Sequence, residues 1–132
     1  MNRIALYTYD STGNDVIINK HLQEMEAFAK NSFGDDVKYD VFIDKTGLSR
    51  DKTGFNKLMD KIKKRQYTFL IVPNINRIYR PEYNMELLVE LMKEIESYRV
   101  QVLDISQGST PQEICYNTII KPLLENNARS AK

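Results

Sequence analysis

The sequence predicts an α/β fold with a largely parallel central sheet of four or five strands and helices on both faces. Short apolar, β-branched runs alternate with longer segments whose apolar residues recur every three or four positions. Each segment between two predicted strands is long enough to hold a helix, as a parallel connection requires. The run YTFLIV at residues 67–72 is almost wholly apolar, which is typical of a strand buried on both faces.

The first half of the chain predicts two strand–helix units. Residues 3–9 (RIALYTY) have the composition of a strand, and the turn-like segment 31–36 ends the helix that follows it. Residues 37–43 are the second predicted strand, and the polar segment 44–53 is a loop. The apolar positions that define the two helices have helical spacing: Ile18, Leu22, Met25, Phe28 and Ala29, then Phe55, Leu58, Met59 and Ile62.

The second half continues the alternation. After the strand at 67–72 comes the loop 73–80 (PNINRIYR), and Pro81 suits the first turn of a helix. Residues 100–105 are the fourth predicted strand, and Pro111 opens a last helix. Pro122 lies within that helix, so we expect the helix to kink or end there.

Length and composition fit one domain, and they exclude several classes of site. The chain has 132 residues and a net charge of +1, so the whole-chain charge gives no sign of nucleic-acid binding. The single Cys115 excludes an internal disulfide, and the single His21 is interpreted as an ordinary helix residue. No apolar run approaches the ~20 residues that span a bilayer. We expect a cytoplasmic protein with no membrane partner and with no metal site built from several cysteines or histidines.

The first strand-end loop supports two interpretations. In parallel sheets, sites form at the carboxyl ends of the strands, and here that loop reads DSTGND. Thr12, Gly13 and Asn14 resemble the loop with which flavodoxins wrap the phosphate of FMN. The carboxylates of Asp10 and Asp15 would repel such a phosphate, and the loop 44–53 has no aromatic residue to stack on a flavin. A flavodoxin-like FMN binder is therefore kept as a less favoured alternative.

The second interpretation places a nucleophile in this loop. Residues 71–80 (IVPNINRIYR) resemble the serine recombinase pattern V-x-x-x-D-R-[LIF]-x-R, with Arg77 and Arg80 at its two arginines. Tyr7, Ser11 and Thr12 resemble that family's Y-x-R-V-S-T. A looser match in the next loop covers Asp44, Thr46, Gly47, Lys52, Gly54 and Phe55. The resemblance to this family of resolvases and invertases extends over about residues 3–120.

This resemblance implies one resolvase-like catalytic domain over residues 1–132, with no C-terminal DNA-binding domain. It implies that Ser11 attacks a DNA phosphodiester to form a 5′-phosphoserine linkage while Arg77 and Arg80 hold the phosphate. Supporting or phosphate-binding roles are implied for Thr12, Asp44, Thr46, Lys52 and Asn76. The implied partners are DNA, bound through a missing or separate segment, and further copies of the chain in a homodimer or tetramer. The family uses no metal or nucleotide cofactor.

Elementary chemistry agrees with these residue types, but some positions depart from the family pattern. Transesterification of DNA needs a hydroxyl nucleophile and cationic donors for the developing negative charge, and arginine donates in a planar fork. Tyr9 and Lys52 stand where the family has arginines, and Asn76 stands where it has an aspartate. Removing one such donor costs ~100- to 1000-fold in rate. The sequence therefore leaves open both an active recombinase and a catalytically inactive interaction or regulatory module.

Overall fold

The computed structural model describes residues 3–10, 12, 14–45, 53–78 and 85–130, with the backbone alone at Thr53, Asn76, Met85 and 127–130. The described strands form one parallel sheet in the order β2-β1-β3-β4. Their bounds are β1 (Ile4–Tyr9), β2 (Tyr39–Asp44), β3 (Phe69–Val72) and β4 (Gln101–Asp104). The predicted α/β class and the parallel sheet are confirmed.

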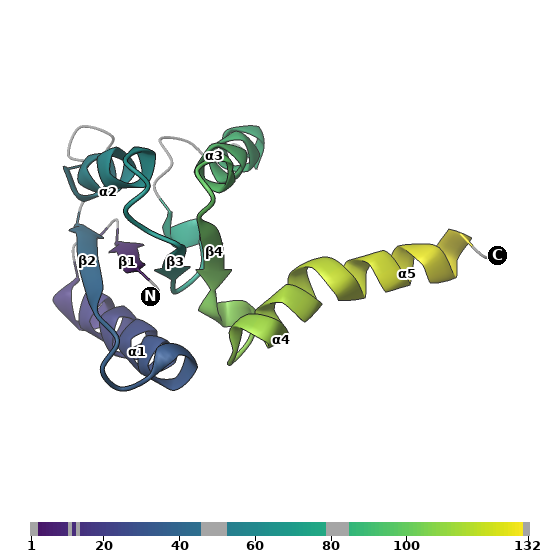
Figure 1. Ribbon diagram of the computed structural model, residues 1–132, viewed down its shortest axis with the longest axis horizontal. Coiled ribbons are helices and arrows are strands. Elements are labelled where there is room, and N and C mark those ends of the chain that lie inside the picture. Colours follow the sequence, from purple (N-terminus) through teal and green to yellow (C-terminus); the bar gives the residue numbers. More distant parts are fainter. Residues whose placement is uncertain (1–2, 11, 13, 46–52, 79–84, 131–132) are drawn as a thin grey trace.

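Helices cover both faces of this sheet (Figure 1). The covering helices are α1 (Asp15–Phe33), α2 (Thr53–Lys63), α3 (Met85–Ser97) and α4 (Pro111–Cys115), and a further helix, α5 (Lys121–Ser130), projects away from the sheet. α2 and α3 bury one apolar cluster, which includes Tyr7, Leu58 and Ile95, against one face. α1 and α4 bury a second cluster, which includes Leu6, Met25 and Ile114, against the other. The strand predicted to be buried on both faces is β3, whose Leu70, Ile71 and Val72 are all buried.

The ends of α1 follow from local chemistry. Asn14 caps its start, because its side-chain oxygen accepts from the backbone N–H groups of Val16 (2.9 Å) and Ile17 (3.4 Å). Gly34 caps its end with a φ of 105°, a backbone conformation that side chains other than glycine rarely adopt. The first loop is therefore joined directly to a helix start at the carboxyl edge of the sheet.

The structure corrects one of the two expectations at Pro122, because the helical run does not end there. α4 passes into a π-helical segment, η3 (Tyr116–Ile120), and α5 follows it to Ser130. Figure 1 shows these elements as one helical run that leaves the body of the domain. The backbone N–H of Lys121 donates to the carbonyl of Tyr116, five residues earlier. This wider turn lies just before the proline ring, which would clash with the carbonyl four residues back in a regular α-helix.

The protruding run carries an apolar stripe that the rest of the described chain does not cover. The exposed apolar residues on it are Tyr116, Ile119, Ile120, Leu123 and Leu124. They are three or four positions apart or adjacent, so they share one side of the run. No helix in the described part of the chain is long and apolar enough to cross a membrane.

Candidate active site

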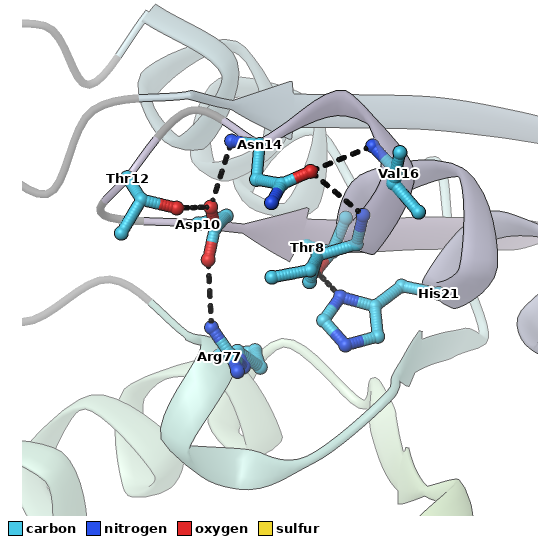
Figure 2. A network of polar contacts seen from close by, with 8 residues as sticks. Thr8, Asp10, Thr12, Asn14, Val16, His21 and Arg77 are labelled. Atoms are coloured by element: carbon cyan, nitrogen blue, oxygen red, sulfur yellow. Dashed lines mark hydrogen bonds and ion pairs between the residues drawn. The ribbon is translucent and has the colours of Figure 1, made fainter.

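Two strand-end segments meet at the carboxyl edge of the sheet. Asp10 follows β1 directly, and the 3-10 helix η1 (Ile75–Arg77) follows β3. The Nη1 atom of Arg77 lies 3.3 Å from Oδ1 of Asp10, which joins residues 67 positions apart in the chain. Figure 2 shows the arginine approaching the carboxylate from the opposite side to the first loop. The predicted cation Arg77 is therefore held against the loop in which sequence reasoning placed the nucleophile.

The Asp10 carboxylate lies at the centre of this contact. Its other oxygen accepts from the hydroxyl of Thr12 and from the backbone N–H of Asn14 (2.9 Å) (Figure 2). The side chain is 4% exposed. The Thr12 hydroxyl and the Asn14 N–H hold the pKa of Asp10 below its usual value, and Arg77 adds to this effect against the opposing effect of burial. Asp10 is therefore ionised at neutral pH.

His21 of α1 lies beside the same group. Its Nδ1 is 3.1 Å from the hydroxyl oxygen of Thr8, a residue that is fully buried in β1 (Figure 2). Burial, and then the positive charge of Arg77, lower the pKa of His21. Sequence reasoning took His21 for an ordinary helix residue. Its spacing from Ile18 and Met25, three and four positions, puts it on the buried face of α1 and was the available signal.

Asp44, at the end of β2, is a second buried carboxylate. It accepts from the Tyr7 hydroxyl (2.7 Å) and from the backbone N–H groups of Gly54 (2.8 Å) and Phe55 (2.9 Å). A Cβ on Gly54 would lie 2.7 Å from the carbonyl oxygen of Ile43, so the close approach of α2 to β2 requires glycine here. The Asp, Gly and Phe of the sequence pattern are therefore in contact with one another, and the Asp44 carboxylate is buried in the domain.

Asp104, at the end of β4, is a third buried carboxylate, and sequence reasoning missed it. Its oxygens accept from the backbone N–H groups of Ile75 (3.0 Å) and Ser106 (2.8 Å). The first of these bonds fixes the start of η1, the segment that carries Arg77. The available signal was an aspartate at a strand end with a serine two residues later, a spacing that suits a capping turn.

The structure describes some of the predicted site residues in full, one by its backbone alone, and others not at all. Thr12 and Arg77 meet at Asp10, and Asp44 stands at the neighbouring strand end with its own donors. Ser11, Thr46, Lys52 and Arg80 lie outside the described residues, as does Pro81. Asn76 belongs to η1, and only the backbone of Asn76 is described. Among the described residues, no group of three or more His, Cys, Asp and Glu side chains could hold a metal ion.

The family model described as "Resolvase, N terminal domain" matches residues 5–125. The chain belongs to this resolvase family. It is therefore the catalytic domain of a site-specific recombinase of the serine type. No curated protein sequence matches the chain.

Solved structures of serine recombinases share the fold of this resolvase domain. The N-terminal catalytic domain of TP901-1 integrase is 15% identical, with 99% of this chain and 100% of that one covered and a TM-score of 0.68. A resolvase family site-specific recombinase from Streptococcus pneumoniae is 20% identical, with 99% and 93% covered and a TM-score of 0.60. The C-terminal catalytic domain of ISC1926 TnpA, an IS607-like serine recombinase, is 15% identical, with 93% and 78% covered and a TM-score of 0.65. At these identities the likeness shows the fold.

The contacts of the first loop also argue against the flavin alternative. A phosphate cradle would need the Thr12 hydroxyl and the Asn14 N–H as donors, and both already donate to Asp10. In the resolvase domain these donors instead hold a carboxylate against an arginine. The Arg77 side chain is 36% exposed, so it is open to contact from solvent, and an arginine in such a position can bind a phosphate.

Proposed function

We propose that this resolvase domain cleaves and rejoins DNA, with Ser11 as the nucleophile and Arg77 and Arg80 as the groups that hold the phosphate. The observation that carries the proposal is the partly exposed Arg77 side chain, whose guanidinium lies 3.3 Å from the Asp10 carboxylate in the first loop. Family membership supports the reaction class, and the position of the Arg77 guanidinium beside the loop that contains Ser11 supports a role for Arg77 in holding phosphate.

In the proposed reaction, the Ser11 hydroxyl loses its proton and attacks the phosphorus of a DNA phosphodiester. The bond from phosphorus to the 3′-oxygen breaks, the 3′-oxygen takes up a proton, and a 5′-phosphoserine linkage remains. Rejoining is the reverse, with a 3′-hydroxyl attacking the phosphoserine. Bond energy is kept in the ester, so neither direction consumes a nucleotide. The two arginines stabilise the negative charge that develops on the phosphate oxygens.

Supporting roles are proposed for the other predicted residues. Thr12 and Asp44 hold strand-end segments in place through the bonds described above. Lys52 is proposed to hold the phosphate as a point charge, without the planar fork of an arginine. Thr46 and Asn76 are proposed to complete the polar lining of the site.

The partners proposed are DNA and further copies of the chain. Domains of this family bind DNA and act as oligomers. We propose that this one forms a homodimer or tetramer through the apolar stripe Tyr116–Leu124, and that residues 1–132 act as a single domain that reaches specific DNA sites through a separate DNA-binding segment. Its place of action would be the cytoplasm, where such DNA is accessible.

Covalent trapping tests the proposed chemistry. The full-length protein is incubated with a library of randomised duplexes that carry a nick beside the cleavage position, so that the cleaved end diffuses away. We expect a protein–DNA adduct on Ser11 by peptide mass spectrometry, and its loss in Ser11→Ala. Ser97→Ala, at an exposed serine of α3, is the matched control and should retain the adduct. A folded wild-type protein that forms no adduct would contradict the enzyme and favour the inactive interaction module.

A further inference from the structure

We infer that Asp10 is a positioning residue of this site, which fixes the Arg77 guanidinium at the first loop and also competes with the DNA phosphate for it. The inference rests on the proposed function, because it concerns the same phosphate-binding arginine. It predicts two opposite effects of one carboxylate: Asp10 weakens DNA binding and speeds cleavage.

The positioning effect follows from the contacts of the carboxylate. Asp10 accepts from the Thr12 hydroxyl and the Asn14 N–H on one oxygen, and from Arg77 on the other at 3.3 Å. It thereby connects the loop after β1, the start of α1 and the end of η1. A flexible arginine side chain loses conformational freedom when it is held in this way, so less entropy remains to be lost between the DNA-bound state and the transition state of cleavage.

The competing effect follows from charge. A buried carboxylate next to Arg77 cancels part of the positive potential that a phosphate would meet, and burial limits the screening by salt. The hydrogen bonds to Asp10 keep it ionised at neutral pH, so the competition persists there. A phosphate must therefore bind the exposed part of the Arg77 side chain, or displace the carboxylate.

Asp10 differs in this respect from the other buried carboxylates in the described part of the domain. Asp44 accepts from Tyr7 and the start of α2, and Asp104 accepts from Ile75 and Ser106. Their described partners are the hydroxyls of Tyr7 and Ser106 and backbone N–H groups, so neither carboxylate offsets the charge of an arginine through these contacts. Only Asp10 among these three forms an ion pair with Arg77.

A binding experiment tests the competing effect. The full chain is titrated into a fluorescein-labelled nicked duplex of mixed sequence, and anisotropy is followed at several salt concentrations. We expect Asp10→Asn to bind about three- to tenfold more tightly than wild type. Asp15→Asn removes the same charge from a 73%-exposed aspartate that pairs with Lys45, and should change affinity by less than about twofold. Equal effects of the two variants would overturn the inference.

A rate experiment tests the positioning effect. Covalent adduct formation at saturating DNA should be about tenfold slower in Asp10→Asn than in wild type, because the guanidinium is less firmly placed. Thr12→Val removes a hydrogen bond to Asp10 and leaves its charge, so it should slow the reaction without tightening binding; Thr12→Ser should restore the rate. If Asp10→Asn does not fold, as judged by thermal unfolding, the Thr12 pair decides. Unchanged rates in Thr12→Val would then overturn the inference.

An Arg77→Gln variant separates failure of the inference from failure of the proposed function. If Arg77→Gln weakens DNA binding but Asp10→Asn does not tighten it, Arg77 holds phosphate and Asp10 does not compete. If Arg77→Gln leaves binding unchanged, the proposed phosphate site is itself wrong, and the inference falls with it. Tighter binding together with slower cleavage in Asp10→Asn would support both, because a purely structural role would impair the two together.

Discussion

Tyr7 lies wholly inside the domain, and its hydroxyl donates to the Asp44 carboxylate at 2.7 Å. Tyr7→Phe removes this donor, so we expect the free energy of unfolding to fall by about 1.5–3 kcal/mol, the range for a hydrogen bond to a charged group. Urea denaturation measures the difference. Tyr116→Phe, at a residue that is 46% exposed, should change stability by less than about 0.5 kcal/mol. Equal losses in the two variants would mean that the buried bond contributes nothing of its own.

The histidine next to the site gives stability a dependence on pH. The pKa of His21 is lowered from 6.5 by burial and by Arg77, so the folded protein resists a proton that the unfolded chain accepts. This contribution to stability is fully present above pH 6.5 and is lost as pH falls from there to the lower folded-state pKa. Unfolding free energies between about pH 5 and 8 should fall toward acid in wild type and be flatter in His21→Gln. Identical profiles would contradict this.

The contacts of some site residues could be predicted from the sequence, and those of others could not. Asp44, Gly54 and Phe55 belong to one local pattern, and the structure brings all three into one contact. Asp10 looked only unfavourable, because a negative charge beside a phosphate site repels the ligand. Its partner Arg77 is 67 positions away, so the pairing depends on how loops from two strands meet. Charge sign alone cannot predict whether a carboxylate has such a partner.

At the scale of elements, periodicity predicted each described strand, with boundaries shifted by one or two residues. The predicted strand 67–72 begins at Phe69, although Tyr67 before it is buried in the same cluster. An apolar run indicates which residues are buried. Here the buried residues begin before the first residue whose backbone pairs with a neighbouring strand. Local rules were least successful at Pro122, where a π-helical turn makes room for the ring. Several residues of this segment are exposed, among them Tyr116, Ile119 and Ile120, so burial in the core does not fix regular α-helical spacing at these positions.

The π-helical segment leads to a prediction about the protruding run. Pro122→Ala restores a backbone N–H and removes the ring that disfavours a regular helix, so η3 should return to α-helical spacing. Hydrogen exchange of the amides around residues 119–126 should slow by about 5- to 50-fold, equivalent to about 1–2.3 kcal/mol of local stability. Exchange in α1 serves as the internal reference. Unchanged exchange around Pro122 would show that the proline does not lower the local stability of the helical run.

At the scale of the whole molecule, the apolar stripe Tyr116–Leu124 projects from the body of the domain, and its exposure needs an explanation (Figure 1). Five neighbouring apolar residues on one side of a helical run form a larger apolar surface than single exposed residues do. The sequence predicted the helix and the apolar residues at its start. It could not predict which of them the domain itself would cover, because that depends on the direction in which the run leaves α4.

We predict that copies of the chain associate with one another through this stripe. Leu123 is 58% exposed, and its burial in a partner would contribute about 1.5–3 kcal/mol to association. Leu123→Glu removes that contribution and places a charge in an apolar contact, so we expect the dissociation constant to rise at least about 50-fold by sedimentation velocity. Val16→Glu is the matched control, because Val16 is a 77%-exposed apolar residue on α1, away from the protruding run. It should leave the sedimentation profile unchanged, since it adds the same charge outside the proposed contact. Equal weakening by both variants would point to net charge, and no weakening by Leu123→Glu would rule out the stripe as the interface.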